Sequence, residues 1–376
     1  MEEVTLLKGS RIKPKYKLLV NKLSRDILSG AYHHKMPGLR ELARKHQVHL
    51  KTMAKAVNIL VEKGLLYREK GIGTFINEEI VKNKLLTIWL LSEKWEEELG
   101  SLRSELIRGL KEGLKEGGRE VEFRMVEMES IKKGVWEESF REGIFQGVIT
   151  TGITLKYKED IKRMIEEGIP CISLLFREEG VNYVDADNIG GAYKAVKYLL
   201  SLGHRNIAFL TGNLETPNMR DNLLGYRKAL EEGGAKYRKE WVKETKSLDP
   251  QEISEITKEL IKKFPQITAF FTSGDLIAVE VVRTLKEMGL KVPEDFSVVG
   301  FDDLPLGRYS HPPLTTVYQP FYEIGKLAAR RFLELVEGKR QKIEEILPTE
   351  LKVRESTGKV RKKNLRLKKK GGEKRC

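Results

Sequence analysis

The apolar positions of the first 77 residues follow helical and then strand periodicities. Leu19, Leu23 and Ile27 recur at steps of four, which predicts the buried face of a first helix. A second helix follows Pro37, and a third follows a turn. The predicted elements are helices at 15–28, 38–45 and after the turn at 46–48, then strands at 65–68 and 74–76. Residues 1–77 are therefore expected to form three helices and a hairpin.

The next 270 or so residues alternate short β-rich runs with amphipathic helical patterns. Predicted strands are 85–91, 122–126, 147–150, 171–175, 206–210, 269–272 and 297–301, and predicted helices include 104–115, 192–202, 224–232, 253–263 and 277–288. This alternation predicts an α/β fold of doubly wound parallel sheets, in which ligands bind at the carboxyl ends of the strands. The length suits two lobes with a cleft between them.

The polar and charged segments divide the chain into parts. We predict a head at 1–77, a linker at 78–84, a two-lobed body at 85–355 and a disordered basic tail at 356–376. The net charge is +14, and it is concentrated at both ends. Residues 8–77 hold 16 Lys or Arg against 4 Asp or Glu, and residues 357–376 hold 10 against 1. A basic head indicates a polyanionic partner, nucleic acid first.

Charge and periodicity together predict a winged helix-turn-helix in the head. In that arrangement the third helix enters the major groove and the hairpin, or wing, reaches phosphates or the minor groove. The outer face of the third helix presents Leu50, Lys51, Ala54, Lys55 and Asn58. Double-stranded DNA is therefore the expected partner.

Several classes of protein are disfavoured by what the chain lacks. The longest apolar run, LLTIWLL, is too short to span a membrane, and the start MEEVTLLKGS lacks the features of a signal peptide. We expect a cytoplasmic protein rather than a secreted transport binding protein. With only Cys171 and Cys376, we expect neither a disulfide framework nor a metal site. No P-loop, HExxH or GxSxG motif occurs, so we expect neither a cofactor nor enzymatic activity.

The segment PGLRELARKHQVHLKTMAKAVNILVEKGLLYREKGIGTFI resembles the DNA-binding domain of the gluconate-repressor (GntR) family along its whole length. The resemblance implies that Arg40 of the second helix contacts DNA, and that the start of the third helix supplies polar contacts. The candidate DNA-binding residues are Arg40, His49, Lys51, Thr52, Lys55 and the wing glycines Gly71 and Gly73. Leu50, Ala54 and Ile72 depart from the family, which often has basic residues there.

Two stretches of the body, GAYKAVKYLLSLGHRNIAFLTG and VPEDFSVVGFDDLPLGRYSHPPLTTVYQP, resemble the effector domain of the lactose-repressor (LacI/GalR) family. That family has the two-lobed fold of periplasmic sugar-binding proteins. The resemblance implies that Asp302 and Gln319 bind sugar hydroxyls in the cleft. We also expect Asp187 at the hinge, and Asp275 and Asp303 as caps of helices or turns.

Other positions complete the predicted cleft or depart from the family. Trp95 follows the first strand of the body, where the family places cleft aromatics. Arg220 lies near the family's sugar-binding arginine, which aligns better with Asn222. Leu175, Asn222 and Gly274 replace groups that bind ring hydroxyls, so the usual hexoses in the usual pose are not expected. The candidate ligand-binding residues are Trp95, Arg220, Asn222, Gly274, Asp302 and Gln319.

The pairing of such a head with such a body resembles the bacterial arabinose repressors. It implies a homodimeric, ligand-responsive repressor of sugar-utilisation genes that a small sugar, L-arabinose first and another pentose second, releases from operator DNA. One alternative is a regulator that responds to a different non-hexose small molecule. Another is an architectural DNA-binding protein with a degenerate cleft.

Overall fold

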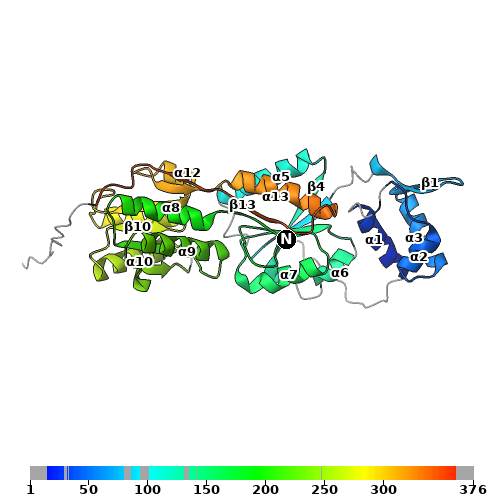
Figure 1. Ribbon diagram of the computed structural model, residues 1–376, viewed down its shortest axis with the longest axis horizontal. Helices are drawn as coiled ribbons and strands as arrows, with labels where there is room; N and C mark the ends of the chain where they lie inside the picture. The colour runs from blue at the N-terminus through cyan, green and yellow to red at the C-terminus, as the bar shows by residue number, and fades with distance from the viewer. Residues whose placement is uncertain are drawn as a thin grey trace, which may run out of the picture.

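The structure is a computed structural model that describes residues 15–28, 32, 34–79, 86–93, 101–130, 135–141, 143–246 and 248–360. Three parts follow one another along its longest axis (Figure 1): a helical head at one end, a first α/β lobe in the middle and a second α/β lobe beyond it. None of the described helices is long and apolar enough to cross a membrane.

The head consists of three helices and a two-stranded hairpin, as predicted. Its elements are α1 (Lys15–Leu28), α2 (Leu39–Lys45), α3 (Leu50–Glu62), β1 (Leu66–Glu69) and β2 (Gly73–Ile76). The hairpin is antiparallel, with Leu66 opposite Ile76 and Glu69 opposite Gly73. Its core is built where α1 meets α3, and Leu23 and Met53 are fully buried there. The apolar periodicity of the sequence is therefore the periodicity of this core.

The first lobe is a six-stranded parallel sheet with helices on both faces. The strand order is β13-β7-β6-β5-β3-β4. The strands are β3 (Leu86–Ser92), β4 (Val121–Glu127), β5 (Gly147–Thr151), β6 (Cys171–Leu174), β7 (Tyr183–Ala186) and β13 (Glu344–Leu347). The helices are α5 (Ser101–Glu116) and α13 (Phe321–Val336) on one face, α6 (Val135–Arg141) and α7 (Lys158–Glu166) on the other, with 3-10 turns at Met128–Ser130 and Leu155–Tyr157.

The second lobe repeats this architecture with the strand order β14-β12-β11-β10-β8-β9. The strands are β8 (Ile207–Thr211), β9 (Val242–Glu244), β10 (Ala269–Thr272), β11 (Ser297–Asp302), β12 (Thr315–Tyr318) and β14 (Glu350–Lys352). The helices are α8 (Asn188–Ser201), α9 (Pro217–Glu232), α10 (Pro250–Lys263), α11 (Asp275–Glu287) and α12 (Pro305–Arg308), with a 3-10 turn at Lys239–Trp241. Only β14 runs antiparallel to its neighbour, so the predicted doubly wound α/β fold is confirmed.

The chain passes between the two lobes three times. The crossings lie between β7 and α8, between β12 and α13, and between β13 and β14. Asp187 in the first crossing binds the third, because its backbone N–H donates to the Leu347 oxygen over 2.8 Å. The Thr349 hydroxyl donates back to the Asp187 carbonyl over 3.1 Å. The side chain of Asp187 also caps α8 by accepting from the Gly190 N–H.

The packed part of the second lobe extends past the predicted boundary at residue 355. Ser356 is fully buried, and its hydroxyl donates to the Val298 carbonyl over 2.6 Å. The Val360 N–H donates to the Leu202 carbonyl over 2.9 Å. The prediction of a disordered tail from residue 356 is therefore wrong for residues 356–360, because these residues fill an edge of the lobe. The rest of the tail, and residues 80–84 of the predicted linker, lie outside the described residues.

Candidate functional site

The predicted DNA-binding residues belong to α2, to α3 with its N-cap and to the hairpin of the head. Helix α1 contacts α6 of the first lobe, and α2, α3 and the hairpin lie on the far side of the head (Figure 1). Arg40 on α2 and Lys51 on α3 are exposed. Lys55 is also exposed, and its ammonium lies 3.9 Å from the centre of the Tyr16 ring, a cation–π contact. A charged surface of this kind is open to a large partner.

Two other predicted residues have local structural roles at the start of α3. His49 is its N-cap, and the His49 Nδ1 accepts a hydrogen bond from the Lys51 N–H over 3.3 Å. Thr52 is half-buried in the first turn. That turn holds no acidic residue, so the positive end of the helix dipole is not offset there. The start of α3 is thereby suited to an anionic partner.

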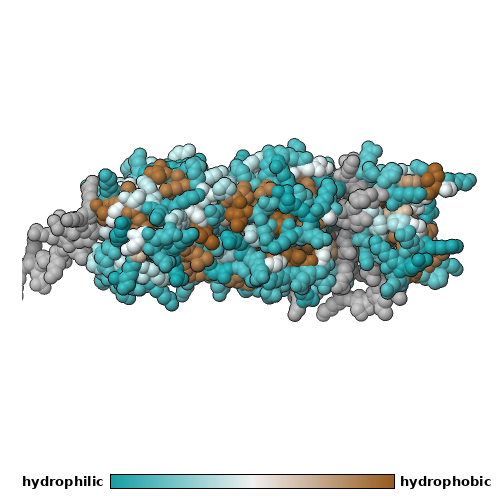
Figure 2. Space-filling view, viewed as in Figure 1, coloured by the Kyte–Doolittle hydropathy of each residue, from teal (hydrophilic) through white to brown (hydrophobic). Residues whose placement is uncertain are grey.

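The wing has the glycine conformations that its sequence predicts. Gly71 has φ +80° and Gly73 has φ +151°, values that side chains with a Cβ rarely adopt. Sequence reasoning did not foresee that the wing is tied to α3: the Arg68 guanidinium donates to the Asn58 side-chain oxygen over 2.6 Å. In the face shown in Figure 2, the head is mainly hydrophilic, with apolar residues at the end where β1 lies.

Asp302 and Gln319 lie together in a cavity of about 400 Å³ between the lobes, which we call the cleft cavity. Asp302 ends β11, and Gln319 stands directly after β12 in the second crossing. The Gln319 Nε2 donates to the Asp302 Oδ1 over 2.7 Å. Within the described part of the protein, the buried Gln319 Oε1 has no hydrogen-bond partner. The lining residues are Ser104, Glu105, Asp302, Asp303, Leu304, Pro305, Arg308, Tyr318, Gln319, Phe321 and Tyr322.

The backbone at the base of the cleft cavity is strained. Asp302 has φ +108° and Asp303 has φ +57°, and two successive non-glycine residues with positive φ are uncommon. Asp303 does not act as the predicted cap: it pairs with Arg308 over 2.8 Å and with Arg354 over 2.6 Å. These ion pairs hold the loop in the conformation that aims Asp302 at the cavity.

The Asp275 side chain also holds the loop that follows β11. One carboxylate oxygen accepts from the Leu304 N–H over 2.7 Å, and the other accepts from the Thr316 hydroxyl over 2.5 Å. The N-cap of α11 is Gly274, so Asp275 is not the predicted helix cap. A Cβ at Gly274 would lie 3.3 Å from the Asp302 Oδ2, which places this candidate residue beside Asp302.

Two buried carboxyl groups at the base of the cleft cavity, those of Asp302 and Asp275, have raised pKa values. Burial raises the pKa of Asp302 well above its usual range, and the neighbouring Asp275 carboxylate adds to this effect. Burial also raises the pKa of Asp275 to about 7, although its two hydrogen bonds oppose the shift. Within the described residues, no group of three or more His, Cys, Asp or Glu could hold a metal ion.

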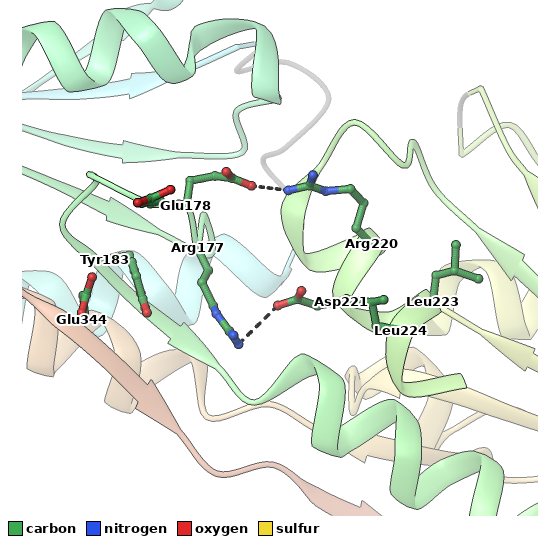
Figure 3. Close-up of a pocket in the computed structure, with 9 residues that line it drawn as sticks. Arg177, Glu178, Tyr183, Arg220, Asp221, Leu223, Leu224 and Glu344 are labelled. Atoms are coloured by element: carbon green, nitrogen blue, oxygen red, sulfur yellow. Dashed lines mark hydrogen bonds and ion pairs between the residues drawn. The ribbon is translucent and has the colours of Figure 1, made fainter. Parts of the chain in front are cut away.

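Arg220 lies in a different cavity. Figure 3 shows this second cavity, of about 600 Å³, with side chains of the first lobe on one side and α9 on the other. Arg220 pairs with Glu178, and Glu178 pairs also with Lys158 over 2.7 Å. Arg177 and Asp221 form a second cross-lobe pair over 3.6 Å. Arg220 therefore does not line the cleft cavity with Asp302, and its guanidinium pairs with Glu178 across the lobe boundary.

Asn222 and Trp95 are the remaining candidate ligand-binding residues, and Leu175 is one of the departures from the family. Asn222 is only 1% exposed, and its Oδ1 has no hydrogen-bond partner among the described residues. Trp95 lies outside the described residues. Leu175 has φ +59° at the end of β6, a strained position for a leucine.

Sequence reasoning missed Arg177 and Glu178. The signal was the charged run FREEG directly after the strand predicted at 171–175, at an edge where ligands and partners bind.

Models of known protein families match both the head and the body of the chain. A model of bacterial regulatory proteins of the gntR family matches residues 15–76, and a model of the periplasmic binding protein-like domain matches residues 196–357. The chain joins a GntR-type helix-turn-helix head to a LacI-type body.

Curated relatives are similar to this chain over about half of its length. The HTH-type transcriptional regulator CelR of Thermobifida fusca is 33% identical over 210 residues, which are 54% of this chain and 62% of CelR. The match thus covers about three fifths of that relative.

Solved structures are similar over a larger share of the chain. A CelR–cellobiose complex matches with a TM-score of 0.64 at 25% identity, covering 85% of this chain and all (100%) of that one. A LacI family regulator from Enterococcus faecium with bound ribose matches with a TM-score of 0.61 at 27% identity, covering 73% of this chain and 100% of that one.

The raised pKa of Asp275 generates a prediction about stability and pH. In the folded state Asp275 loses its proton near pH 7, whereas in the unfolded chain it does so near pH 4. The folded state therefore binds more protons between these values, and stability should fall as pH rises from about 4 to about 7. A shift of about three units corresponds to ~4 kcal/mol at most. Asp275→Asn should remove the part of this pH dependence that Asp275 contributes and leave the part that comes from Asp302 and the buried Asp185, whose pKa values are also raised. The variant should fold, because an amide can still accept from Leu304 and donate to Thr316.

The measurement is the thermal unfolding midpoint of the full chain at pH 5 and pH 8. Asp295→Asn, at an exposed position of the same lobe, is the matched control and should keep the wild-type difference between the two midpoints. If Asp275→Asn also kept that difference, the assignment of a raised pKa to this carboxyl would be wrong.

Proposed function

We propose that this protein is a DNA-binding transcription regulator whose affinity for operator DNA is controlled by a small sugar bound between the lobes. The observation that carries the proposal is the Asp302–Gln319 pair, which lies on a chain crossing of a body that bears a basic helix-turn-helix head. The simplest mode of regulation is repression of sugar-utilisation genes, in which the protein leaves the DNA when the sugar binds.

The chemistry of the cleft cavity supports a polyhydroxylated ligand. Asp302 offers oxygens to hydroxyl donors, and the unpartnered Gln319 Oε1 offers another acceptor. Phe321 and Tyr322 line the same cavity and supply flat apolar surface for a ring face. A buried polar atom without a hydrogen-bond partner, next to an aromatic surface, suits a sugar better than an apolar ligand.

The side chains that depart from the family pattern favour a pentose over the usual hexoses. Gly274 and Leu175 offer no side-chain hydrogen bonds, and Arg220 is engaged by Glu178. Fewer hydroxyl partners favour a smaller sugar. L-arabinose is the first candidate by resemblance to the arabinose repressor AraR, and ribose is a second, since a structural neighbour of the body was solved with bound ribose.

The assembly that fits this function is a homodimer made through the body. One head of about 60 residues reads one half-site, and specific operators generally present two half-sites related by a two-fold axis. The partner of the pair of heads would then be a palindromic operator.

The first prediction from this function concerns Lys51 at the start of α3. Lys51→Ala should weaken binding to DNA and reduce the slope of log affinity against log salt by about one, because one phosphate contact is lost. The measurement is fluorescence anisotropy over a salt series, with the full chain and a duplex selected from a random library.

Lys236→Ala is the matched control, because Lys236 is an exposed lysine of the second lobe, far from the head. It should leave affinity and salt slope unchanged. Equal slopes for wild type, Lys51→Ala and Lys236→Ala would show that the start of α3 does not face DNA.

The second prediction concerns the cleft cavity. Calorimetric titration of the full chain with pentoses and hexoses should identify one that binds. Asp302→Ala should then weaken it by about thirty-fold to a thousand-fold, because roughly 2–4 kcal/mol is lost when buried hydroxyls lack their acceptor. Asp302→Asn should also weaken binding, and asparagine tolerates the positive φ of this position better than alanine.

DNA affinity in the absence of sugar should stay at the wild-type value in both variants, which controls for folding. Glu294→Ala, at an exposed acid of the same lobe, should bind the sugar normally. Wild-type sugar affinity in Asp302→Asn would remove Asp302 from the site. A wild-type protein that binds DNA but none of the sugars would contradict sugar control and leave the architectural alternative.

A further inference from the structure

The outward face of α3 carries an apolar stripe among its basic residues. Leu50, Ala54 and Asn58 follow one another at steps of four, so they lie on one face of the helix. Leu50 is 41% exposed, and Ala54 is partly exposed. Lys51 and Lys55 form the neighbouring exposed row, and α3 lies on the side of the head away from the body (Figure 1).

Leu50 has no role in the core of the head. The buried face of α3 consists of Met53, Ala56, Val57 and Leu60, on the side opposite the stripe. A single exposed leucine is ordinary on a protein surface. This one, however, occupies the first turn of α3, beside the exposed Lys51 and with no acidic residue to offset the positive helix end. The charge around Leu50 therefore matches DNA, while its side chain can neither donate nor accept a hydrogen bond.

The far end of the stripe is held in place. Asn58 accepts a hydrogen bond from Arg68 of the wing over 2.6 Å, which fixes α3 relative to the hairpin. If phosphates lie along the lysine row, Leu50 and Ala54 point at base edges rather than at the backbone. The major groove offers one apolar group to such side chains, the C5-methyl group of thymine.

We propose that Leu50, with Ala54 one turn later, reads thymine methyl groups in the major groove of the operator. This inference rests on the proposed function and adds which base the helix recognises. Apolar contact then replaces the hydrogen bonds to guanine that basic side chains would make at these positions. Each half-site should contain at least one thymine whose methyl group touches Leu50.

The test replaces thymine by uracil, which keeps base pairing and removes only the methyl group. Binding sites are first selected from a random duplex library with the full chain, and each thymine of the selected site is then changed in turn. Wild-type affinity should fall about fourfold at one or two positions per half-site, as expected for one lost methyl contact. Leu50→Ala should bind the unmodified site more weakly and should lose the sensitivity to uracil at those positions.

Ile72→Ala is the matched control. Ile72 is 60% exposed at the tip of the wing, which is expected to reach phosphates or the minor groove rather than base edges in the major groove. This variant should keep the wild-type uracil sensitivity. Because Leu50 and Ile72 are both exposed, neither substitution should lower the thermal unfolding midpoint.

The outcomes separate this inference from the proposed function. If the library yields no enriched site, the proposed DNA-binding function fails. If a site is enriched but uracil has no effect at any position, or affects Leu50→Ala as strongly as wild type, the reading of thymine by Leu50 is wrong. If only Ile72→Ala loses the sensitivity, the contact belongs to the wing instead.

Discussion

The three chain crossings between the lobes are the constraint on which the rest of the structure depends. They join the lobes along one side, so relative motion is limited to hinge-like opening and closing. The first and third crossings are bonded to each other through Asp187, Leu347 and Thr349. The second holds Gln319, which is bonded to Asp302 and leads directly into α13 of the first lobe. A ligand at this pair would therefore act at the hinge itself.

Contacts on the other side of the lobe boundary oppose opening. Glu178 of the first lobe is only 11% exposed and binds both Lys158 and, across the boundary, Arg220. The Leu155 N–H also donates to the Glu215 carbonyl across the boundary over 3.0 Å. Partly buried ion pairs are screened less by salt than exposed ones. These contacts between the lobes are polar, and a ligand that binds one arrangement of the lobes better than another would shift the balance between the two.

Local patterns predicted most of the elements, and tertiary contacts decided the rest. Periodicity located the three helices of the head and every predicted strand of the body to within a residue or two. It missed the strands β7, β9, β12, β13 and β14, which have three or four residues each and lie at an edge of a sheet or next to one. It also missed the packed segment after residue 355, where the chain has no regular structure and is held by hydrogen bonds to another strand.

Some candidate site residues could likewise be predicted from local patterns, and others could not. Arg40, Lys51 and Lys55 were predicted to be on the outer face of the head, and they are exposed because the opposite face is apolar. Asp302 and Gln319 were placed by resemblance, since no periodicity indicates that residues 17 positions apart form a hydrogen bond. The partner of Arg220 could not be predicted, because Glu178 reaches it only after both lobes have folded and met.

The coupling between the cleft cavity and the head is tested most directly by thermodynamic linkage. The affinity of the full chain for its selected operator is measured with and without saturating sugar, and its affinity for the sugar is measured with and without saturating operator. If the sugar acts through the hinge, both ligands weaken each other by the same factor, and that factor is lost in Asp302→Asn. A sugar that binds through Asp302 and leaves operator affinity unchanged would contradict the coupling of the two sites.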